Sequence, residues 1–278
     1  MKLFVDNLTN VDFSYLDPKR GLLGESWLVE LELDGSLNEQ GMICDFGIVK
    51  KRVKDWFDAG IDHALVVPTE MPDLSVTTSS GYRQVSWLYQ GQACSCRSPE
   101  QAIVPVPLTS VTPEGMAKWC EAELLALFPD EVKGLSLRFV PEAIDGAYYH
   151  YSHGLQQHDG NCQRIAHGHR SRLKLYLDGR RHPALEKAWA QTFCDIYIGT
   201  RAHLVGDESA PVWTFRYQAP QGDFEICLPR SVCYLIETES TVEQIAMHLA
   251  DEVKKAHPNQ VVKVRAYEGM AKGAIAER

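Results

Sequence analysis

The sequence has no apolar run that approaches the roughly 18 residues of a membrane-spanning helix. Its first residues, 1–7, also lack the apolar core of a signal peptide. Positive charge is not in excess, because the formal net charge is −9 at pH 7, and this argues against a nucleic-acid-binding surface. We therefore expect a cytoplasmic protein that binds neither membranes nor nucleic acids.

The cysteines lack the spacing of a disulfide framework. There are eight of them, scattered along the chain, which fits reduced thiols in the cytoplasm. Cys94 and Cys96 lack a two-residue spacer and a matching second pair, so we expect them to be structural. The 278 residues are 45% apolar and 23% charged, as in soluble globular proteins, and suffice for two ordinary domains or one large one.

Several segments recur in the same order in the two halves of the chain. Segment 27–35 is echoed by segment 172–179, and segment 112–117 is echoed by segment 241–246. A repeat at so long an offset indicates a domain duplication and not a solenoid. The expected domains are residues 1–145 and 146–278.

Each half has an α+β pattern. Apolar residues recur at helical spacing in segments 46–57 and 242–253, whereas 172–177 alternates like a β-strand. This order predicts antiparallel sheets with helices on one face. Such sheets have edges that must be covered or closed, and we expect a homo-oligomer that closes them into a barrel.

Three histidines and one cysteine gather in a short stretch of the second half. His167 and His169 stand two positions apart on a predicted strand, so both imidazoles face the same way. Paired histidines on a strand are usually solvated or hydrogen-bonded locally. With His153 upstream as a third nitrogen ligand, the pattern favours an open three-histidine zinc site. Cys162 fits a reactive thiol beside that metal.

These motifs, in this order, resemble the 6-pyruvoyl-tetrahydropterin synthase and 6-carboxytetrahydropterin synthase family. The resemblance implies two tandem T-fold domains of ββααββ type, a Zn²⁺ cofactor and the substrate 7,8-dihydroneopterin triphosphate. By the same resemblance, the zinc ligands are His153, His167 and His169, and the catalytic residues are Cys162, Asp62 and His63.

The matching residues are divided between the halves. At the places of the zinc ligands the first half has Asp17, Leu23 and Glu25, and leucine cannot bind a metal, so we expect no zinc there. The second half lacks an aspartate directly before His203. Because the family's cysteine and Asp-His pair come from different subunits, the split implies one composite site per chain. Its parts could meet within one chain or between neighbouring chains.

Residue roles follow from the resemblance. Cys162 would be the general base, and Asp62 would hold His63 in one tautomer for proton transfer. Glu268 would bind the pterin ring, with Glu142 as its equivalent in the first half. The remaining substrate-binding candidates are Thr241, which is also placed to cap a helix, and Arg170 together with Arg172, for phosphate or carboxylate.

Two departures from the family pattern bear on the reaction. Arg170-Ser171 replaces Asn-Tyr after the paired histidines, and Val67 replaces an asparagine. The choice between carboxy and pyruvoyl products therefore stays open. So do two other functions, a zinc-bearing pterin-binding protein without turnover and a T-fold enzyme that cleaves the dihydroneopterin side chain by an aldol reaction.

Overall fold

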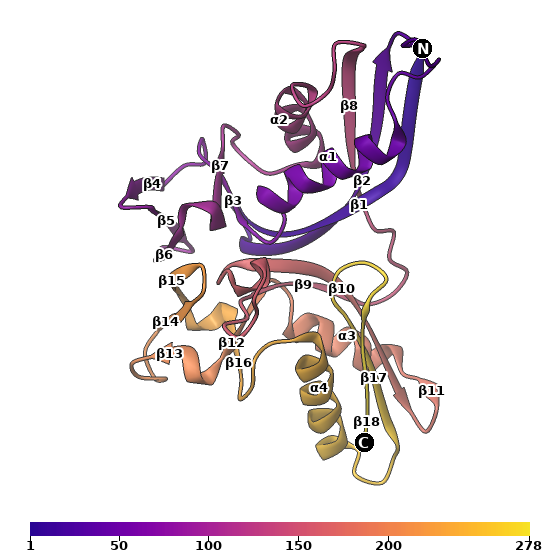
Figure 1. Cartoon of the computed structure of the whole chain (residues 1–278). Coiled ribbons are helices and arrows are strands. Elements are labelled where there is room, and N and C mark those ends of the chain that lie inside the picture. The colour runs from indigo at the N-terminus through magenta and orange to yellow at the C-terminus, as the bar shows by residue number, and fades with distance from the viewer.

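The computed structural model describes residues 1–278 and has the predicted α+β fold, built from two similar halves (Figure 1). The seam of the duplication, at residues 145 and 146, lies between the last strand of the first half and the first strand of the second. The first half contains β1 (Lys2–Asp17), β2 (Gly21–Gly35), α1 (Phe46–Ala59), β3 (Leu65–Pro68), β4 (Leu74–Ser79), β5 (Tyr82–Tyr89), β6 (Gln92–Pro99), β7 (Ile103–Val106), α2 (Pro113–Leu125) and β8 (Val132–Pro141).

The second half repeats this order with small changes. Its elements are β9 (Tyr148–His153), β10 (His167–Leu177), β11 (Arg180–Arg181), α3 (Pro183–Thr192), β12 (Ile196–Thr200), β13 (Leu204–Val205), β14 (Val212–Ala219), β15 (Gly222–Pro229), β16 (Cys233–Ile236), α4 (Val242–Ala256), β17 (Val262–Tyr267) and β18 (Gly273–Glu277).

The predicted helices are confirmed, and local chemistry explains where they begin. The Asp45 carboxylate accepts hydrogen bonds from the backbone N–H groups of Gly47 and Ile48, which caps α1. Thr112 and Thr241 cap α2 and α4 in the same way. Each helix then buries its apolar face on the sheet of its own half.

Each half has one main sheet. The strand order is β7-β3-β1-β2-β8 in the first half and β16-β12-β9-β10-β17-β18 in the second. The long pairs β1–β2 and β9–β10 are antiparallel, as predicted. The short strands β3 and β12 instead run parallel to β1 and β9, because a helix leads into each of them and reverses the chain.

A third sheet joins the halves, with the order β13-β14-β15-β6-β5-β4. Its central pair, β15 and β6, comes from different halves. Large side chains from both halves, including Trp87 and Phe215, are buried in one hydrophobic cluster beneath it. Since burial of one such side chain contributes roughly 1.5–3 kcal/mol, this cluster fastens the two halves together.

The main sheets also meet face to face, with β1 and β2 lying over β9 and β10 (Figure 1). Gly24 and Gly168 make this close approach possible, because a Cβ on either would overlap the carbonyl oxygen of Tyr151. At the same place the hydroxyl groups of Ser14 and Ser152 are 2.7 Å apart and hydrogen-bonded. The interface between the halves is therefore buried and closely packed.

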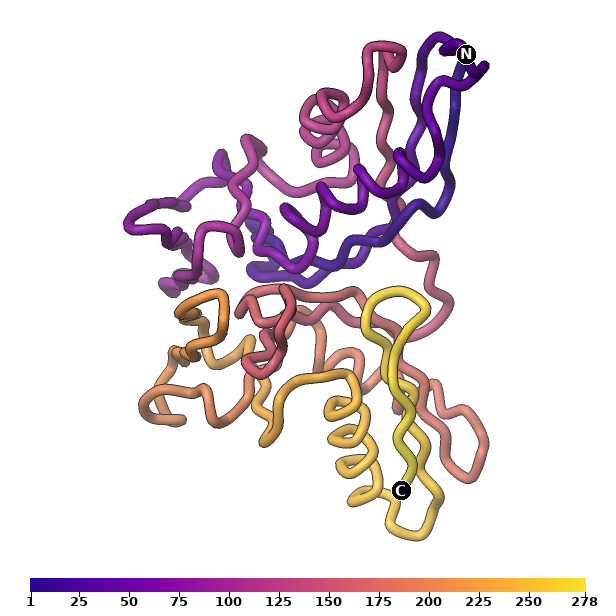
Figure 2. Tube along the Cα trace, in the orientation of Figure 1, coloured from indigo at the N-terminus to yellow at the C-terminus, as the bar shows by residue number.

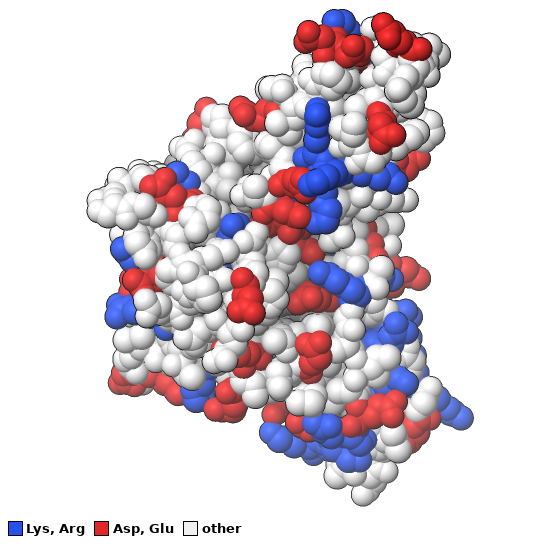
Figure 3. Space-filling view, in the orientation of Figure 1, with Lys and Arg blue, Asp and Glu red and all other residues white.

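The outer surface carries both signs of charge. Acidic and basic side chains are interspersed over both halves on the face shown in Figure 3. None of the helices combines the length and the apolar character needed to cross a bilayer.

Candidate functional site at the interface of the two halves

The three predicted histidine ligands meet where β9 pairs with β10. His153 lies directly opposite His167 in the antiparallel register, and His169 follows on the same face of β10. All three are buried, with at most 1% exposure. One ring nitrogen of each lies within 4.8 Å of a ring nitrogen of the others. The strand pairing therefore assembles the cluster.

Hydrogen bonds fix the orientation of two of these rings, those of His153 and His167. Nδ1 of His153 is 2.9 Å from the carbonyl oxygen of Ser240, and Nδ1 of His167 is 2.9 Å from that of Arg164. In both residues Nε2 is buried without a hydrogen-bond partner. Burial also lowers the pKa of both histidines well below its usual value, which keeps them in the neutral form that binds metals. These orphaned nitrogens fit a zinc ion, whose histidine ligands use one nitrogen while the other is hydrogen-bonded.

The Asp62–His63 pair comes from the first half. His63 Nδ1 is 2.6 Å from a carboxylate oxygen of Asp62, and the His63 ring lies 5.2 Å from that of His167, centre to centre. His63 has a left-handed backbone with φ of 56°. Burial lowers the pKa of His63, but hydrogen bonds to Asp62 and Cys162 outweigh this and raise that pKa to about 10. Its imidazole is thus held as a proton donor near neutral pH.

Cys162 lies on the loop between β9 and β10, within the short helical turn Asn161–Gln163. The Asn161 side chain donates to the carbonyl of Asp58 in the first half, at 2.9 Å, which fixes the loop against α1. The Cys162 sulfur, His63 and His167 have candidate ligand atoms within 4.8 Å of one another. In this structure the candidate residues from both halves thus lie together within one chain.

The hairpin tip between β17 and β18, yellow in Figure 2, reaches from the second half to the first. Glu268 begins this tip, and one of its carboxylate oxygens is 4.0 Å from His169 Nε2. Lys272 ends it, with Nζ 3.4 Å from Asp12 and 3.8 Å from Glu268. Glu268 therefore lies at the histidine cluster, where the sequence predicted a pterin-binding carboxylate.

The other predicted substrate contacts make structural interactions. Side chains alternate along a strand, so Arg170 faces away from the side that carries His169. The Arg170 guanidinium donates to the backbone oxygen of Glu142 at 2.7 Å, and Arg172 pairs with the Glu142 carboxylate at 2.6 Å. The predicted phosphate-binding role of Arg170 and ligand-binding role of Glu142 are corrected accordingly. Thr241 caps α4, the structural alternative.

The same strand register corrects the alignment of the two halves. In the first half Tyr15 lies opposite Leu23, as His153 lies opposite His167. The equivalent of His153 is thus Tyr15 and not Asp17, because the predicted match was two positions out of register. Leu23 and Glu25 remain at the other two positions. This set offers no cluster of metal ligands, whereas the second half does.

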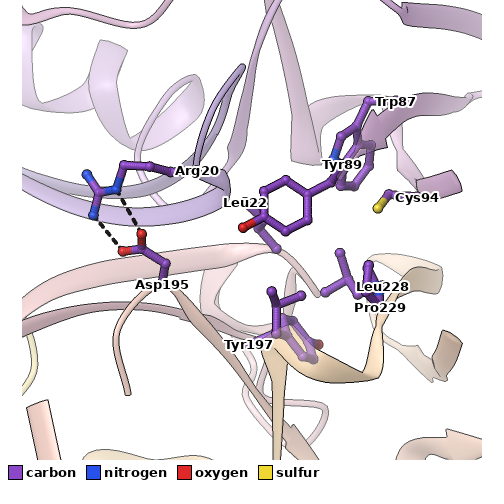
Figure 4. A pocket seen from close by; sticks show the side chains of 10 residues that line it. Arg20, Leu22, Trp87, Tyr89, Cys94, Asp195, Tyr197, Leu228 and Pro229 are labelled. Carbon is purple, nitrogen blue, oxygen red and sulfur yellow. Dashed lines mark hydrogen bonds and ion pairs between the residues drawn. The ribbon is translucent and has the colours of Figure 1, made fainter. Parts of the chain in front are cut away.

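In the second half, Cys194-Asp195 occupies the position of Asp62-His63. The sequence analysis had instead looked for this pair at His203 and the residue before it. Asp195 has the same φ of 56° as His63 and likewise precedes a short parallel strand. Its carboxylate binds the Arg20 guanidinium at 2.8 and 2.5 Å (Figure 4). The adjoining cavity is only about 10 Å³, enough for about one water molecule and far too small for a pterin. The Arg20–Asp195 ion pair thus stands where the other half of the molecule has His63.

The sequence analysis did not identify three residues that contact the histidine cluster: Asp12, Ser240 and Arg164. Asp12 is 1% exposed and is a charged residue within a run of buried residues in β1. A charged residue at a buried strand position is rarely without a function, and that was the available signal. Ser240 and Arg164 hold metal-ligand candidates mainly through their backbone carbonyls, so no side-chain pattern could have identified them.

Glu25 gives a prediction about stability and pH. Burial raises its pKa from 4.5 to about 7, with its carboxylate 3.9 Å from His150. The folded protein therefore binds this proton more tightly than the unfolded chain, and wild-type stability is lost as pH rises from about 4.5 through 7. Glu25→Gln should be more stable than wild type by roughly 2–3 kcal/mol at pH 8, with the gain shrinking toward pH 4.5.

Urea denaturation of the metal-free proteins at pH 5 and pH 8 measures this gain. The neighbouring His150 titrates in both proteins, so its contribution largely cancels in the difference between them. A difference that does not change with pH would contradict the assignment of a buried, protonated Glu25.

Comparison with known proteins finds similarity to tetrahydropterin synthases. The family model for 6-pyruvoyl tetrahydropterin synthase matches residues 11–142, the half that carries Asp62 and His63. A solved 6-pyruvoyl tetrahydropterin synthase from Plasmodium vivax has a TM-score of 0.39 and 16% identity, over 51% of this chain and 98% of its own. Two relatives named "Putative 6-carboxy-5,6,7,8-tetrahydropterin synthase", from Pyrococcus abyssi and Pyrococcus horikoshii, are 26% and 25% identical over 46% of this chain and 73% of their own. By the family model, residues 11–142 of the chain belong to the 6-pyruvoyl tetrahydropterin synthase family, and the two relatives agree with this.

Proposed function

We propose that this chain is a zinc-dependent tetrahydropterin synthase that acts on 7,8-dihydroneopterin triphosphate. One observation supports the proposal most strongly. Three buried histidines with converging nitrogens lie beside the Cys162 thiol of their own half and beside the Asp62–His63 pair of the other half. A metal ligand set alone would fit many enzymes. The added thiol and Asp–His pair supply two groups for proton transfer next to it.

The cofactor would be held by His153, His167 and His169, which leave a fourth position open for substrate. Bound zinc would supply Lewis-acid polarisation of the oxygens on the pterin side chain. Backbone carbonyls orient the rings of His153 and His167, and burial favours their neutral form, so the chain itself prepares two of the three ligands.

The two proton-transfer groups would have different roles, Cys162 as the base and His63 as the acid. Cys162, beside His63, would take a proton from a side-chain carbon of the substrate. His63, which Asp62 holds in one orientation, would donate a proton to a side-chain oxygen. When the triphosphate group is the leaving group, inorganic triphosphate carries away the bonding electrons. Which carbon loses its proton decides the product.

Glu268 would recognise the pterin ring. A carboxylate can accept two parallel hydrogen bonds from the ring's 2-amino and N3 groups. Glu268 is partly exposed, with 22% of its side chain accessible, and Lys272 lies within 3.8 Å as a counter-charge. A pterin ring bound beside His169 would therefore have this carboxylate within reach.

The assay that tests this proposal uses the purified, zinc-loaded protein and 7,8-dihydroneopterin triphosphate. Release of inorganic triphosphate with a carboxy or pyruvoyl pterin is the expected result, and Cys162→Ala serves as the matched inactive protein. Release of an aldehyde with retention of the triphosphate would instead indicate aldol cleavage. Tight pterin binding without any product would identify a binding protein.

We also propose that the chain forms a homo-oligomer. Each main sheet has an edge strand that pairs with no further strand of the chain, β8 in the first half and β18 in the second. Unpaired edges of this length favour pairing with another copy. Sedimentation of the purified protein tests this, and a monomer at micromolar concentration would contradict it.

A further inference from the structure

One carboxylate of the first half sits at the centre of the site, that of Asp12. It is 1% exposed and has four polar side chains around it, of which two donate hydrogen bonds and two lie at ion-pair distance. Ser26 donates its hydroxyl, and the Asn10 amide is 3.1 Å away. Lys272 Nζ is 3.4 Å away and His169 Nδ1 is 3.3 Å away. A carboxylate this deeply buried is retained only when its charge is compensated, as it is here.

The backbone of the same residue holds the acid–base pair. The Asp12 N–H donates to the Asp62 carboxylate at 2.9 Å, and the Asp12 carbonyl accepts from the His63 N–H at 2.7 Å. The second of these bonds fixes His63 in its left-handed conformation. Asp12 thus touches the Asp–His pair through its main chain and the histidine cluster through its side chain.

His169 needs such a partner more than the other two histidines do. Nδ1 of His153 and of His167 are hydrogen-bonded to carbonyl oxygens, whereas neither ring nitrogen of His169 has a hydrogen bond. The 3.3 Å between His169 Nδ1 and Asp12 is an ion-pair distance without hydrogen-bond alignment. A small rotation of the ring would direct its Nδ1–H bond at the carboxylate and leave Nε2 for a metal.

We infer that Asp12 is a positioning residue that orients His169 as a metal ligand and links the metal site of one half to the Asp62–His63 pair of the other. The inference rests on the proposed function, in that the three histidines hold a metal ion. It adds a carboxylate–histidine–metal arrangement in which the carboxylate comes from the half that has no ligands of its own.

Asp12→Asn tests this through metal affinity. The amide keeps the shape of the side chain but loses the charge that His169 faces. Competition with a chromophoric chelator should give a dissociation constant for Zn²⁺ about 10- to 100-fold above that of wild type. The Co²⁺-loaded variant should also show a changed visible absorption spectrum, because one ligand has lost its fixed orientation.

The duplication provides a matched control. His150 occupies the place of Asp12 in the second half and lies equally within the interface, beside Glu25. His150→Asn should leave Zn²⁺ affinity unchanged, because its neighbours are not metal ligands. An equal loss of affinity in both variants would overturn the inference, since loosening of the interface would then explain both. Unchanged affinity in Asp12→Asn would also overturn it.

A second measurement does not depend on a folded variant. In the unaltered, metal-free protein, nitrogen-15 spectra of the histidine rings should place a proton on Nδ1 of His169, assigned by loss of that signal in His169→Gln. A neutral His169 with its proton on Nε2 would overturn the inference. Neither measurement requires turnover. A protein whose zinc affinity depends on Asp12 but that converts no dihydroneopterin triphosphate would therefore contradict the proposed function and leave the inference about Asp12 intact.

Discussion

A mixture of Cys162→Ala and His63→Ala chains is expected to stay inactive, even when subunits exchange freely. Each substitution removes one proton-transfer group, and each alone should lower turnover by about 10²- to 10⁴-fold. In the structure the Cys162 sulfur and the His63 ring belong to one chain and lie within 4.8 Å. Exchange of whole chains therefore cannot bring an intact Cys162 to an intact His63.

The control for this experiment mixes wild-type chains with chains that carry both substitutions. Differently tagged subunits report whether exchange has occurred, and the wild-type chains should keep their full activity per active chain. Activity that reappears in the mixture of single variants would mean that the composite site forms between chains. The face-to-face packing of β1 and β2 on β9 and β10 would then be wrong as a description of the active protein.

His167→Ala is expected to abolish stoichiometric metal binding and, with it, activity. His167 is 0% exposed, has Nε2 unpartnered, and lies between the other two imidazoles and the Cys162–His63 pair. Its loss leaves two nitrogen ligands, too few for a stable zinc site. Metal analysis should fall from about one equivalent per chain to near zero, whereas Cys162→Ala should keep its metal and lose turnover.

His203→Ala is the matched control for that variant. His203 is also a buried histidine of the second half, at 7% exposure, but its Nε2 is 2.9 Å from the Gln156 side chain and 3.3 Å from Glu239. We expect it to retain its zinc. Retention of full metal content by His167→Ala would contradict the three-histidine site.

The sequence was sufficient where the determining interactions are local. The helices begin at capping residues such as Asp45 and carry apolar residues at helical spacing. His167 and His169 face the same way because they are two residues apart on a strand, and a strand of alternating residues was evident from the sequence. These features depend on a few neighbouring residues, so they can be read in one segment at a time.

The sequence was insufficient where distant segments meet. The pairing of β15 with β6 joins strands more than a hundred residues apart, and neither strand indicates its partner. The match of Asp17 to a zinc-ligand position failed because a strand register is set by pairing, which places Tyr15 opposite Leu23. The role of Asp12 likewise depends on a hairpin and a strand from the other half.

The two halves differ at the place of the Cys162 loop and of the Asp62–His63 pair. Arg20 lies on the short turn between β1 and β2, at the place of the long loop that carries Cys162 in the second half. With Asp195 it forms an ion pair where the other site has His63. The first half thus lost the thiol loop and the ligands, but kept the Asp–His pair that the second half lacks.

We propose one metal centre per chain, held by the second half and completed by the first. Anomalous X-ray scattering at the zinc absorption edge, from crystals of the zinc-loaded protein, would locate this centre. We expect one strong peak per chain among His153, His167 and His169, with the Cys162 sulfur and the His63 ring of the same chain beside it. A second peak near Tyr15, Leu23 and Glu25, or a His63 contributed by another chain, would contradict it.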